Sequence, residues 1–307
     1  MVKTERIEPS GAITLAASAL ATAGVASPRA EAEWLAAYVL QVPRGRLALT
    51  DGFTPGQLAG FNELVARRSR REPLQHLVGS APFRYLELAV GPGGFVPRPE
   101  TELLAGWGIE AARTAAQGDT IVVDLCSGTG AIALAVANEV PAARVVAVER
   151  SAPALDWLRR NAADRAAAGD RPIQVVAADV TDPNLLDDLV GRVDVLLCNP
   201  PYVPAGTAVP PEVADHDPAE AVFGGVDGLA IIRPVIARAA VLLRPGGALG
   251  VEHDDTHAEA VPALLRAIGC FTEIVDHHDL AGRPRFVTAR RTATDGAAAV
   301  AWQTGSS

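Results

Sequence analysis

From about residue 98 onward, short apolar stretches alternate with stretches of helical periodicity, and this alternation most constrains what the chain can fold into. Strands separated by helices favour a mainly parallel sheet with helices on both faces. The segment between the last two apolar stretches, 278–283, is too short for a helical crossover, so we expect those two strands to pair antiparallel. The sequence therefore predicts an α/β fold with a seven-stranded sheet, whose candidate strands are 120–124, 144–149, 173–178, 193–198, 247–252, 271–277 and 284–289.

Three helices are expected ahead of this sheet. The first falls in the charge-free run 9–28, the second starts at Ser27-Pro28 and covers 30–40, and the third covers 55–70. Proline suits the first position of a helix because its φ is already helical and its missing N–H is not needed there. Four apolar residues of the second helix are spaced to form one buried face: Trp34, Leu35, Tyr38 and Val39.

Two further segments complete the expected domain organisation. Residues 79–97 carry apolar residues on both sides of a glycine-rich stretch, which predicts a β-hairpin linker. Residues 292–307 are rich in Ala, Gly, Ser and Thr and are expected to form a flexible tail. The helical domain is thus expected at 1–78 and the sheet domain at 98–291.

Charge and composition argue against several classes of protein. A net charge of −9 and a pI near 5.2 disfavour stable nucleic-acid binding, because phosphate contacts need clustered Lys and Arg. The strongest basic cluster, 67–71, is expected to be the solvated end of a helix, with docking to an acidic protein surface or RNA as the functional alternative. The run 9–28 follows two basic residues, as in a secretory signal, but it is too weakly apolar for export or membrane insertion.

The cysteines and histidines give no pattern of a metal site. Cys126, Cys198 and Cys270 form no C-x-x-C pair, which argues against structural zinc and favours a reducing compartment, the cytoplasm. His253 and His257 are spaced as a metal pair, but they cross a strand-to-helix turn. No metal is therefore expected.

An apolar strand, 121–125, runs through glycines into an apolar helix, 131–137. Glycines let a backbone approach a ligand closely, and the N–H groups at a helix start point the same way. A nucleotide-like cofactor is therefore expected here. The glycine pattern, together with Glu149 at the end of the next strand, also fits a dinucleotide dehydrogenase, which is therefore an alternative at this point.

Asp124, just before the turn, separates these two possibilities. A carboxylate there suits a cofactor that carries ammonium and sulfonium charge, and it repels a pyrophosphate. S-adenosylmethionine meets this requirement, with Glu149 accepting from the ribose hydroxyls and Asp179 from the adenine amine. Alternatively, each acid is a solvated strand end. The remaining candidate cofactor-binding residues are Cys126, Ser127, Gly128, Thr129, Gly130, Val180 and Asn199.

The tetrad Asn199-Pro200-Pro201-Tyr202 follows the apolar stretch 193–198 and can form an amide-binding pocket. The prolines fix their φ angles, and the Asn199 oxygen and Pro200 carbonyl can accept both protons of a planar NH2 group. Tyr202 can cover a flat face of the substrate, which leaves the nitrogen lone pair facing an electrophile. The alternative is a proline-rich turn with no chemical role.

These residues resemble the PrmC/HemK glutamine methyltransferases, which methylate a glutamine amide in peptide-chain release factors. The likeness covers roughly residues 12–291 and includes the segments 71–79, 95–102, 211–218 and 224–229. It implies a Rossmann-like class I methyltransferase sheet, a substrate-docking helical domain, catalysis by the tetrad, and substrate binding by Arg98, Glu100 and the tetrad. Cys126 departs from the family, since many methyltransferases have a glycine there.

Other functions stay open at the level of sequence. A ribosomal protein glutamine is an alternative substrate, and the same tetrad can hold the amine of adenine in DNA or RNA. A nicotinamide-dependent oxidoreductase is disfavoured by Asp124, and a noncatalytic docking protein would not need Asn199.

Overall fold

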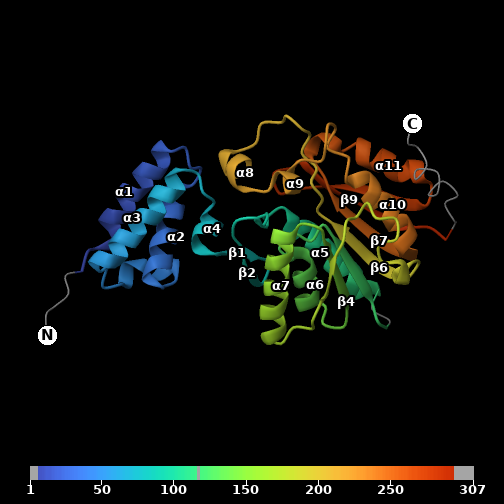
Figure 1. Ribbon diagram of the computed structural model, residues 1–307, viewed down its shortest axis with the longest axis horizontal. Helices are drawn as coiled ribbons and strands as arrows, with labels where there is room; N and C mark the ends of the chain where they lie inside the picture. Colours follow the sequence, from blue (N-terminus) through green and yellow to red (C-terminus); the bar gives the residue numbers. More distant parts are fainter. Residues whose placement is uncertain (1–5, 116–117, 294–307) are drawn as a thin grey trace. The chain divides into compact units, whose positions relative to one another are not determined.

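The computed structural model describes residues 6–115 and 118–293, and the chain divides into two compact units (Figure 1). Residues 1–80 and 209–216 form one, here called the helical unit; residues 81–208 and 217–307 form the other, the sheet unit. Across the two described ranges, every helix falls short of the length and apolar character that crossing a bilayer requires. The predicted tail lies almost wholly outside the described residues.

The helical unit contains the three predicted helices, α1 (Pro9–Thr22), α2 (Pro28–Leu40) and α3 (Pro55–Ser69). Each begins with proline, as expected for a first helical position. A capping box, in which Thr54 and Gln57 exchange hydrogen bonds, also fixes the start of α3. The remaining elements are a 3-10 helix (Arg44–Leu49), α4 (Leu74–Val78) and α8 (Pro211–His216).

The prediction for the buried face of α2 was half wrong. Leu35 is buried and Val39 packs against the core of the unit, but Trp34 and Tyr38 are 50% and 49% exposed. Alanines occupy much of the buried face instead, at positions that include Ala32 and Ala36. Small side chains let neighbouring helices pack closely, so the large rings are left at the surface.

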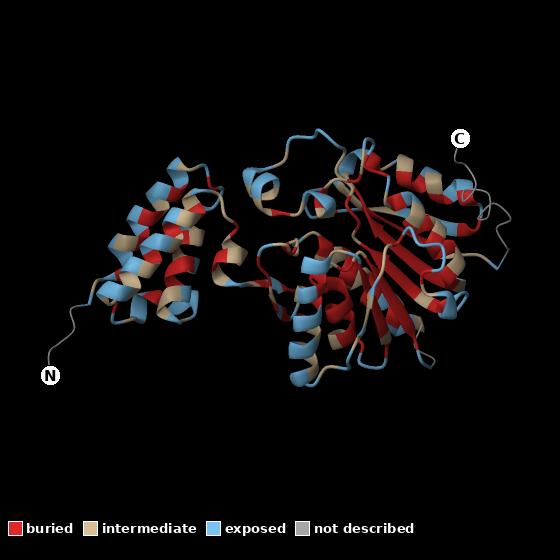
Figure 2. Cartoon of the chain, viewed as in Figure 1, coloured by how far each residue is buried: buried red, intermediate tan, exposed pale blue. Residues whose placement is uncertain are grey.

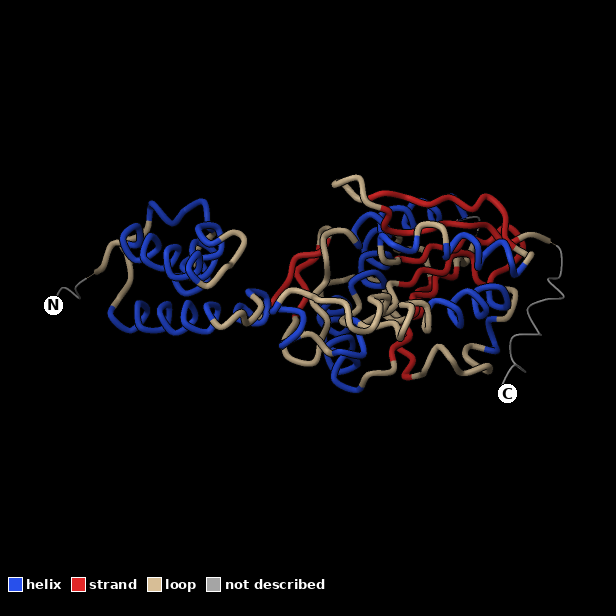
Figure 3. Tube along the Cα trace, turned by 90° about the horizontal axis from the view of Figure 1, so that it is seen from above, coloured by secondary structure: helices blue, strands red, loops and turns tan. Residues whose placement is uncertain are grey.

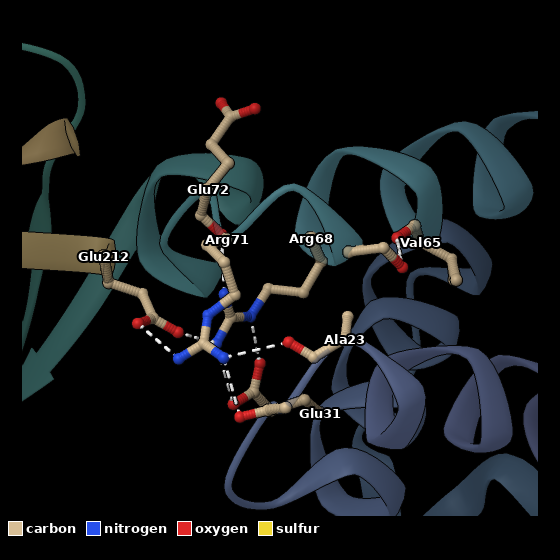
Figure 4. A network of polar contacts seen from close by, with 9 residues as sticks. Ala23, Glu31, Val65, Arg68, Arg71, Glu72 and Glu212 are labelled. Carbon is tan, nitrogen blue, oxygen red and sulfur yellow. Dashed lines mark hydrogen bonds and ion pairs between the residues drawn. The ribbon is translucent and has the colours of Figure 1, made fainter. Parts of the chain in front are cut away.

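The basic cluster 67–71 is not simply a solvated helix end, and for Arg68 that prediction was wrong (Figure 4). The Arg68 side chain is 5% exposed and forms ion pairs with Glu31 of α2 and, at 2.7 Å, with Glu212 of α8. Arg71 also pairs with Glu212 at 2.7 Å and donates to the Ala23 carbonyl. Sequence spacing gave no sign of these partners, because Glu212 lies more than a hundred residues away.

The two arginines determine the charge state of Glu212. Burial by itself would raise the pKa of this carboxyl, but the hydrogen bonds from Arg71 and Arg68 outweigh burial and lower the pKa to about 2. The ionised carboxylate therefore holds α8 within the helical unit over the physiological pH range.

The seven-stranded sheet of the sheet unit confirms the predicted fold class. Its strand order is β5-β4-β3-β6-β7-β9-β8. The last two strands, β8 and β9, pair antiparallel, as the short segment between them predicted. Strand β9 also pairs antiparallel with β7, which the sequence did not predict. The predicted hairpin is the two-stranded sheet of β1 (Ser80–Phe83) and β2 (Leu86–Ala89). The strands of the main sheet are β3 (Ile121–Leu125), β4 (Arg144–Glu149), β5 (Gln174–Ala177), β6 (Val193–Cys198), β7 (Leu243–Glu252), β8 (Phe271–His278) and β9 (Pro284–Arg291).

Helices cover both faces of this sheet (Figure 3). Alternate strand residues point to opposite faces, so Val122 and Val123 belong to different core clusters. One cluster joins the sheet to α5 (Thr101–Ala115), α6 (Ala131–Glu139) and α7 (Ala152–Ala167), and the other joins it to α10 (Ile232–Leu242) and α11 (Ala260–Ile268). The central strands are accordingly buried along most of their length (Figure 2). Short helices α9 (Ala219–Val222), η2 (Asp187–Leu189) and η3 (Asp255–His257) complete the unit.

Candidate cofactor and amide site

The predicted site residues gather at one edge of the sheet. Strands β5, β4, β3 and β6 are adjacent and parallel, so their carboxyl ends share that edge (Figure 1). Leu125 pairs with Cys198 across β3 and β6. Cys126 and Asn199 are therefore the first residues beyond this paired position on neighbouring strands, which brings the start of the glycine turn beside the start of the tetrad. This is the edge at which open α/β sheets bind their ligands.

Asp124 is a buried acid with one unused oxygen. The residue is 1% exposed, and its Oδ2 atom accepts a hydrogen bond from the backbone N–H of Ala133 at 3.1 Å. Oδ1 is buried and has no hydrogen-bond partner among the described residues. Burial raises the pKa of Asp124 to about 7, and hydrogen bonding by Ser127 and by the Ala133 N–H offsets only part of that rise. An ammonium group would satisfy the unused acceptor and stabilise the charge, so this residue fits an amino-acid-like cofactor.

The turn after β3 has an unusual backbone at Cys126. This residue has φ of 57°, in the left-handed region that favours glycine. The Cβ of an L-residue crowds the backbone there, which costs about 1–2 kcal/mol. The departure from the family pattern therefore places a strained residue at the start of the turn. Gly130 has φ of 93°, which also favours glycine, and packing gives a second reason for glycine there, since a Cβ would lie 2.6 Å from Leu158 of α7.

Glu149 holds the same turn from the end of β4. Its Oε2 accepts from the backbone N–H of Gly128, and its Oε1 accepts from the N–H groups of Arg150 and Ser151, each at 2.8 Å. The sequence did not suggest these contacts. Each oxygen of the Glu149 carboxylate has a further lone pair that could accept from a ribose hydroxyl. Contact between Glu149 and the ribose stays a prediction, and the same residue also fixes the turn.

Asp179 and Val180 follow β5 at the same edge. Asp179 accepts from Arg150 at 3.1 Å and from the N–H and hydroxyl of Thr181 at 2.8 and 2.7 Å. Burial opposes ionisation, but these hydrogen bonds lower the pKa of Asp179, so it is an ionised acceptor. The Val180 side chain is 7% exposed and belongs to the core. Contacts of these two residues with adenine stay predictions.

The tetrad is held by side chains from two other elements. The Asn199 amide nitrogen donates to the Thr101 hydroxyl at the start of α5, at 3.1 Å. The Tyr202 hydroxyl donates to Glu252 at the end of β7, at 3.0 Å. Pro200 and Pro201, between these two residues, are buried. Because the Asn199 nitrogen is engaged by Thr101, its oxygen is the group available to accept from a substrate.

Thr101 and Glu252 were missed as site residues in the sequence. Thr101 lies in the motif 95–102, and Glu252 ends a predicted strand. An acid at the carboxyl end of the strand next to β6 was the signal that could have identified Glu252.

Arg98 and Glu100 lie just before α5. Arg98 forms an ion pair with Asp217, and its guanidinium lies 4.7 Å from the centre of the Phe95 ring. Glu100 is half-buried. Binding of substrate by these two residues stays a prediction, and for Arg98 it must coexist with the Asp217 pair.

Comparisons with known proteins show the family to which this chain belongs. The family model described as PrmC N-terminal domain matches residues 11–79, and the methyltransferase small domain model matches residues 110–216. A release factor glutamine methyltransferase of Mycolicibacterium smegmatis is 54% identical, covering 92% of this chain and 97% of that protein. Its namesake in Streptomyces coelicolor is 48% identical, covering 91% and 96%. A crystal structure of a methyltransferase from Pyrococcus furiosus, at 15% identity and a TM-score of 0.50, covers 74% of this chain and 98% of that one and supports the fold alone.

Proposed function

The chain belongs to the release factor glutamine methyltransferase family, and we propose that it transfers a methyl group from S-adenosylmethionine to a glutamine side-chain amide in a peptide-chain release factor. The observation that carries this proposal is the strand register between β3 and β6. In support of the proposal, this register brings residues 199–202, the proposed amide-binding tetrad, beside the turn 126–130, the proposed cofactor site. Transfer between two bound groups requires this proximity.

Residues at the ends of three strands would hold the cofactor. Asp124 offers its unused oxygen to the cofactor's ammonium group, Glu149 to the ribose and Asp179 to the adenine amine. The turn 126–130 provides the close backbone approach between these acids. When bound, S-adenosylmethionine supplies a methyl group made electrophilic by the sulfonium.

The tetrad supplies orientation, which an amide nucleophile needs most. The lone pair of an amide nitrogen is delocalised into its carbonyl, so the nitrogen is a poor nucleophile. Hydrogen bonds from its two N–H groups to Asn199 Oδ1 and to the Pro200 carbonyl oxygen favour a pyramidal nitrogen. Packing against the Tyr202 ring aligns the nitrogen with the methyl group. As the N–C bond forms and the S–C bond breaks, positive charge develops on the nitrogen, and the two acceptor oxygens would stabilise it until one of its protons is lost to water. Such positioning can contribute about 7–11 kcal/mol.

The helical unit is the proposed docking surface for the release factor. It matches the PrmC N-terminal domain over almost all of its first segment. A substrate from the translation machinery implies the cytoplasm as the site of action, where the free cysteines Cys126, Cys198 and Cys270 remain reduced.

Incubation with methyl-labelled cofactor tests this function. The purified protein is offered separate pools of release factors, ribosomal proteins, DNA and RNA, and the labelled residue is mapped by mass spectrometry. We expect label on one glutamine of a release factor, and labelling about 10²- to 10³-fold slower when Asn199→Ala replaces the wild type. Label on a ribosomal protein or on nucleic acid, with none on a release factor, would overturn the proposed substrate.

A further inference from the structure

Two buried side chains outside the tetrad form hydrogen bonds with its polar groups. Thr101 is 3% exposed and Glu252 is 1% exposed, and neither belongs to the cofactor turn. Thr101 contacts Asn199 at 3.1 Å, and Glu252 contacts Tyr202 at 3.0 Å. We propose that Thr101 and Glu252 are positioning residues for methyl transfer, which fix the Asn199 oxygen and the Tyr202 ring against the substrate amide. This inference rests on the proposed function.

The Asn199 side chain needs such a partner because its amide oxygen and its NH2 group have nearly the same shape. If the Asn199 side chain turned by 180°, its NH2 would face the NH2 of the substrate, and two donors would meet. A threonine hydroxyl alone does not prevent this, since a hydroxyl can either donate or accept. The direction of the Thr101 hydrogen bond therefore has to be set by a third group.

Glu252 is the group that can set this direction. Its Oε2 is buried, and nothing in the described part of the chain forms a hydrogen bond of normal geometry with it. Burial raises the pKa of Glu252 to about 7, and hydrogen bonding by Thr101 and Tyr202 works against that rise. Asn199 and Tyr202, only three residues apart, contact Thr101 and Glu252 respectively. When the Thr101 proton faces the carboxylate, the hydroxyl oxygen can only accept from Asn199. The Asn199 oxygen then faces the substrate.

Arg285 sets the direction of the second contact. Its guanidinium lies 3.5 Å from the Tyr202 hydroxyl and 3.3 Å from Asp279. Because arginine only donates, the Tyr202 proton faces Glu252. Glu252 thus accepts from Tyr202 and, when ionised, can also accept from Thr101, so that one buried side chain would orient both the acceptor and the ring of the tetrad.

Three substitutions test this arrangement. Thr101→Val keeps the shape of the side chain and removes the hydroxyl, whereas Thr101→Ser keeps the hydroxyl. Thr120→Val is the matched control: Thr120 is also buried, its hydroxyl has no partner within the residues that the structure describes, and it lies before β3, at the opposite end of that strand from the site. We compare kcat, KM for the release factor, the Kd of the cofactor and the Tm.

We expect Thr101→Val to lower kcat by about 10²-fold, as misplacement of a reacting group does, with the cofactor Kd unchanged. Thr101→Ser should recover activity to within about threefold, and Thr120→Val should match the wild type. A normal kcat in Thr101→Val, or a Thr101→Ser variant as slow as Thr101→Val, would overturn the positioning role. So would a loss of kcat in Thr120→Val equal to that in Thr101→Val.

A second measurement keeps this inference separate from the proposed function. Hydrogen exchange of the Asn199 side-chain NH2, followed by NMR, needs no substrate. We expect exchange at least about tenfold faster in Thr101→Val than in the wild type or Thr101→Ser, because a hydrogen bond protects the protons. Equal exchange rates would contradict the inference. A wild type that binds cofactor but methylates no release factor would instead contradict the proposed function.

Discussion

Asp124 is expected to make cofactor binding depend on pH, because its pKa is about 7 in the free protein. An ammonium group beside the carboxyl favours the ionised form, so binding should release a proton when the free residue is protonated. Affinity should therefore rise with pH up to about 7 and then level off. Below pH 7, each unit should weaken binding about tenfold, or about 1.4 kcal/mol.

Isothermal titration calorimetry measures this directly. S-adenosylmethionine is titrated between pH 5.5 and 7.5, and the Kd values near the upper end are corrected for the fraction of the cofactor's own amino group, with a pKa of about 8, that has lost its charge. Repeating each titration in two buffers of different ionisation enthalpy counts the protons released. We expect a Kd about tenfold higher at pH 6 than on the plateau, with release of nearly one proton.

Asp124→Asn is the control, since the amide has nearly the same shape and does not titrate. Its Kd should be higher than that of the wild type and nearly constant over the same pH range. This control also separates Asp124 from Glu252, whose pKa is raised to about 7 as well but which contacts the tetrad. A wild-type Kd that does not change with pH, or no proton release at pH 6, would refute the role assigned to Asp124.

Three other substitutions have definite expected outcomes. Asn199→Ala should lower kcat about 10²- to 10³-fold while the cofactor Kd stays the same, because an acceptor used during transfer is removed; an unchanged kcat would contradict this. Cys126→Gly should raise the free energy of unfolding by up to about 1 kcal/mol in urea titrations, because it relieves a left-handed φ; lower stability would argue against strain there. Glu212→Gln should lower the free energy of unfolding by about 3 kcal/mol at pH 7, because it leaves Arg68 without one of its charged partners. Since the folded pKa of Glu212 lies below the ordinary 4.5, its contribution is present above that value and disappears as the pH falls toward 2, so wild type and variant should converge there.

Local patterns explain why so much of the sheet was predictable. The predicted strand 144–149 matches β4, and 193–198 matches β6, because each is a mostly apolar stretch that a parallel sheet buries on both faces. The antiparallel end of the sheet followed from the length of one loop. The position of Asp124, Glu149 and Asn199 at a common edge then followed from topology alone, since carboxyl ends of adjacent parallel strands lie together.

Contacts between distant residues were not predictable in the same way. Thr101 and Asn199 are 98 residues apart, and Tyr202 and Glu252 are 50 apart. The burial of Arg68 depends on a partner even further along the chain. No periodicity within a single element carries information about such pairs, and the exposed Trp34 of α2 shows that periodicity also fails where small residues pack a helix interface.

The most direct test of the account is a crystal structure of the protein with S-adenosylhomocysteine and a release-factor fragment that contains the target glutamine. We expect the glutamine amide nitrogen within hydrogen-bond distance of both Asn199 Oδ1 and the Pro200 carbonyl oxygen, on the line along which the methyl group would leave the sulfur. A glutamine amide bound elsewhere, or an Asn199 whose nitrogen faces the substrate, would contradict the account.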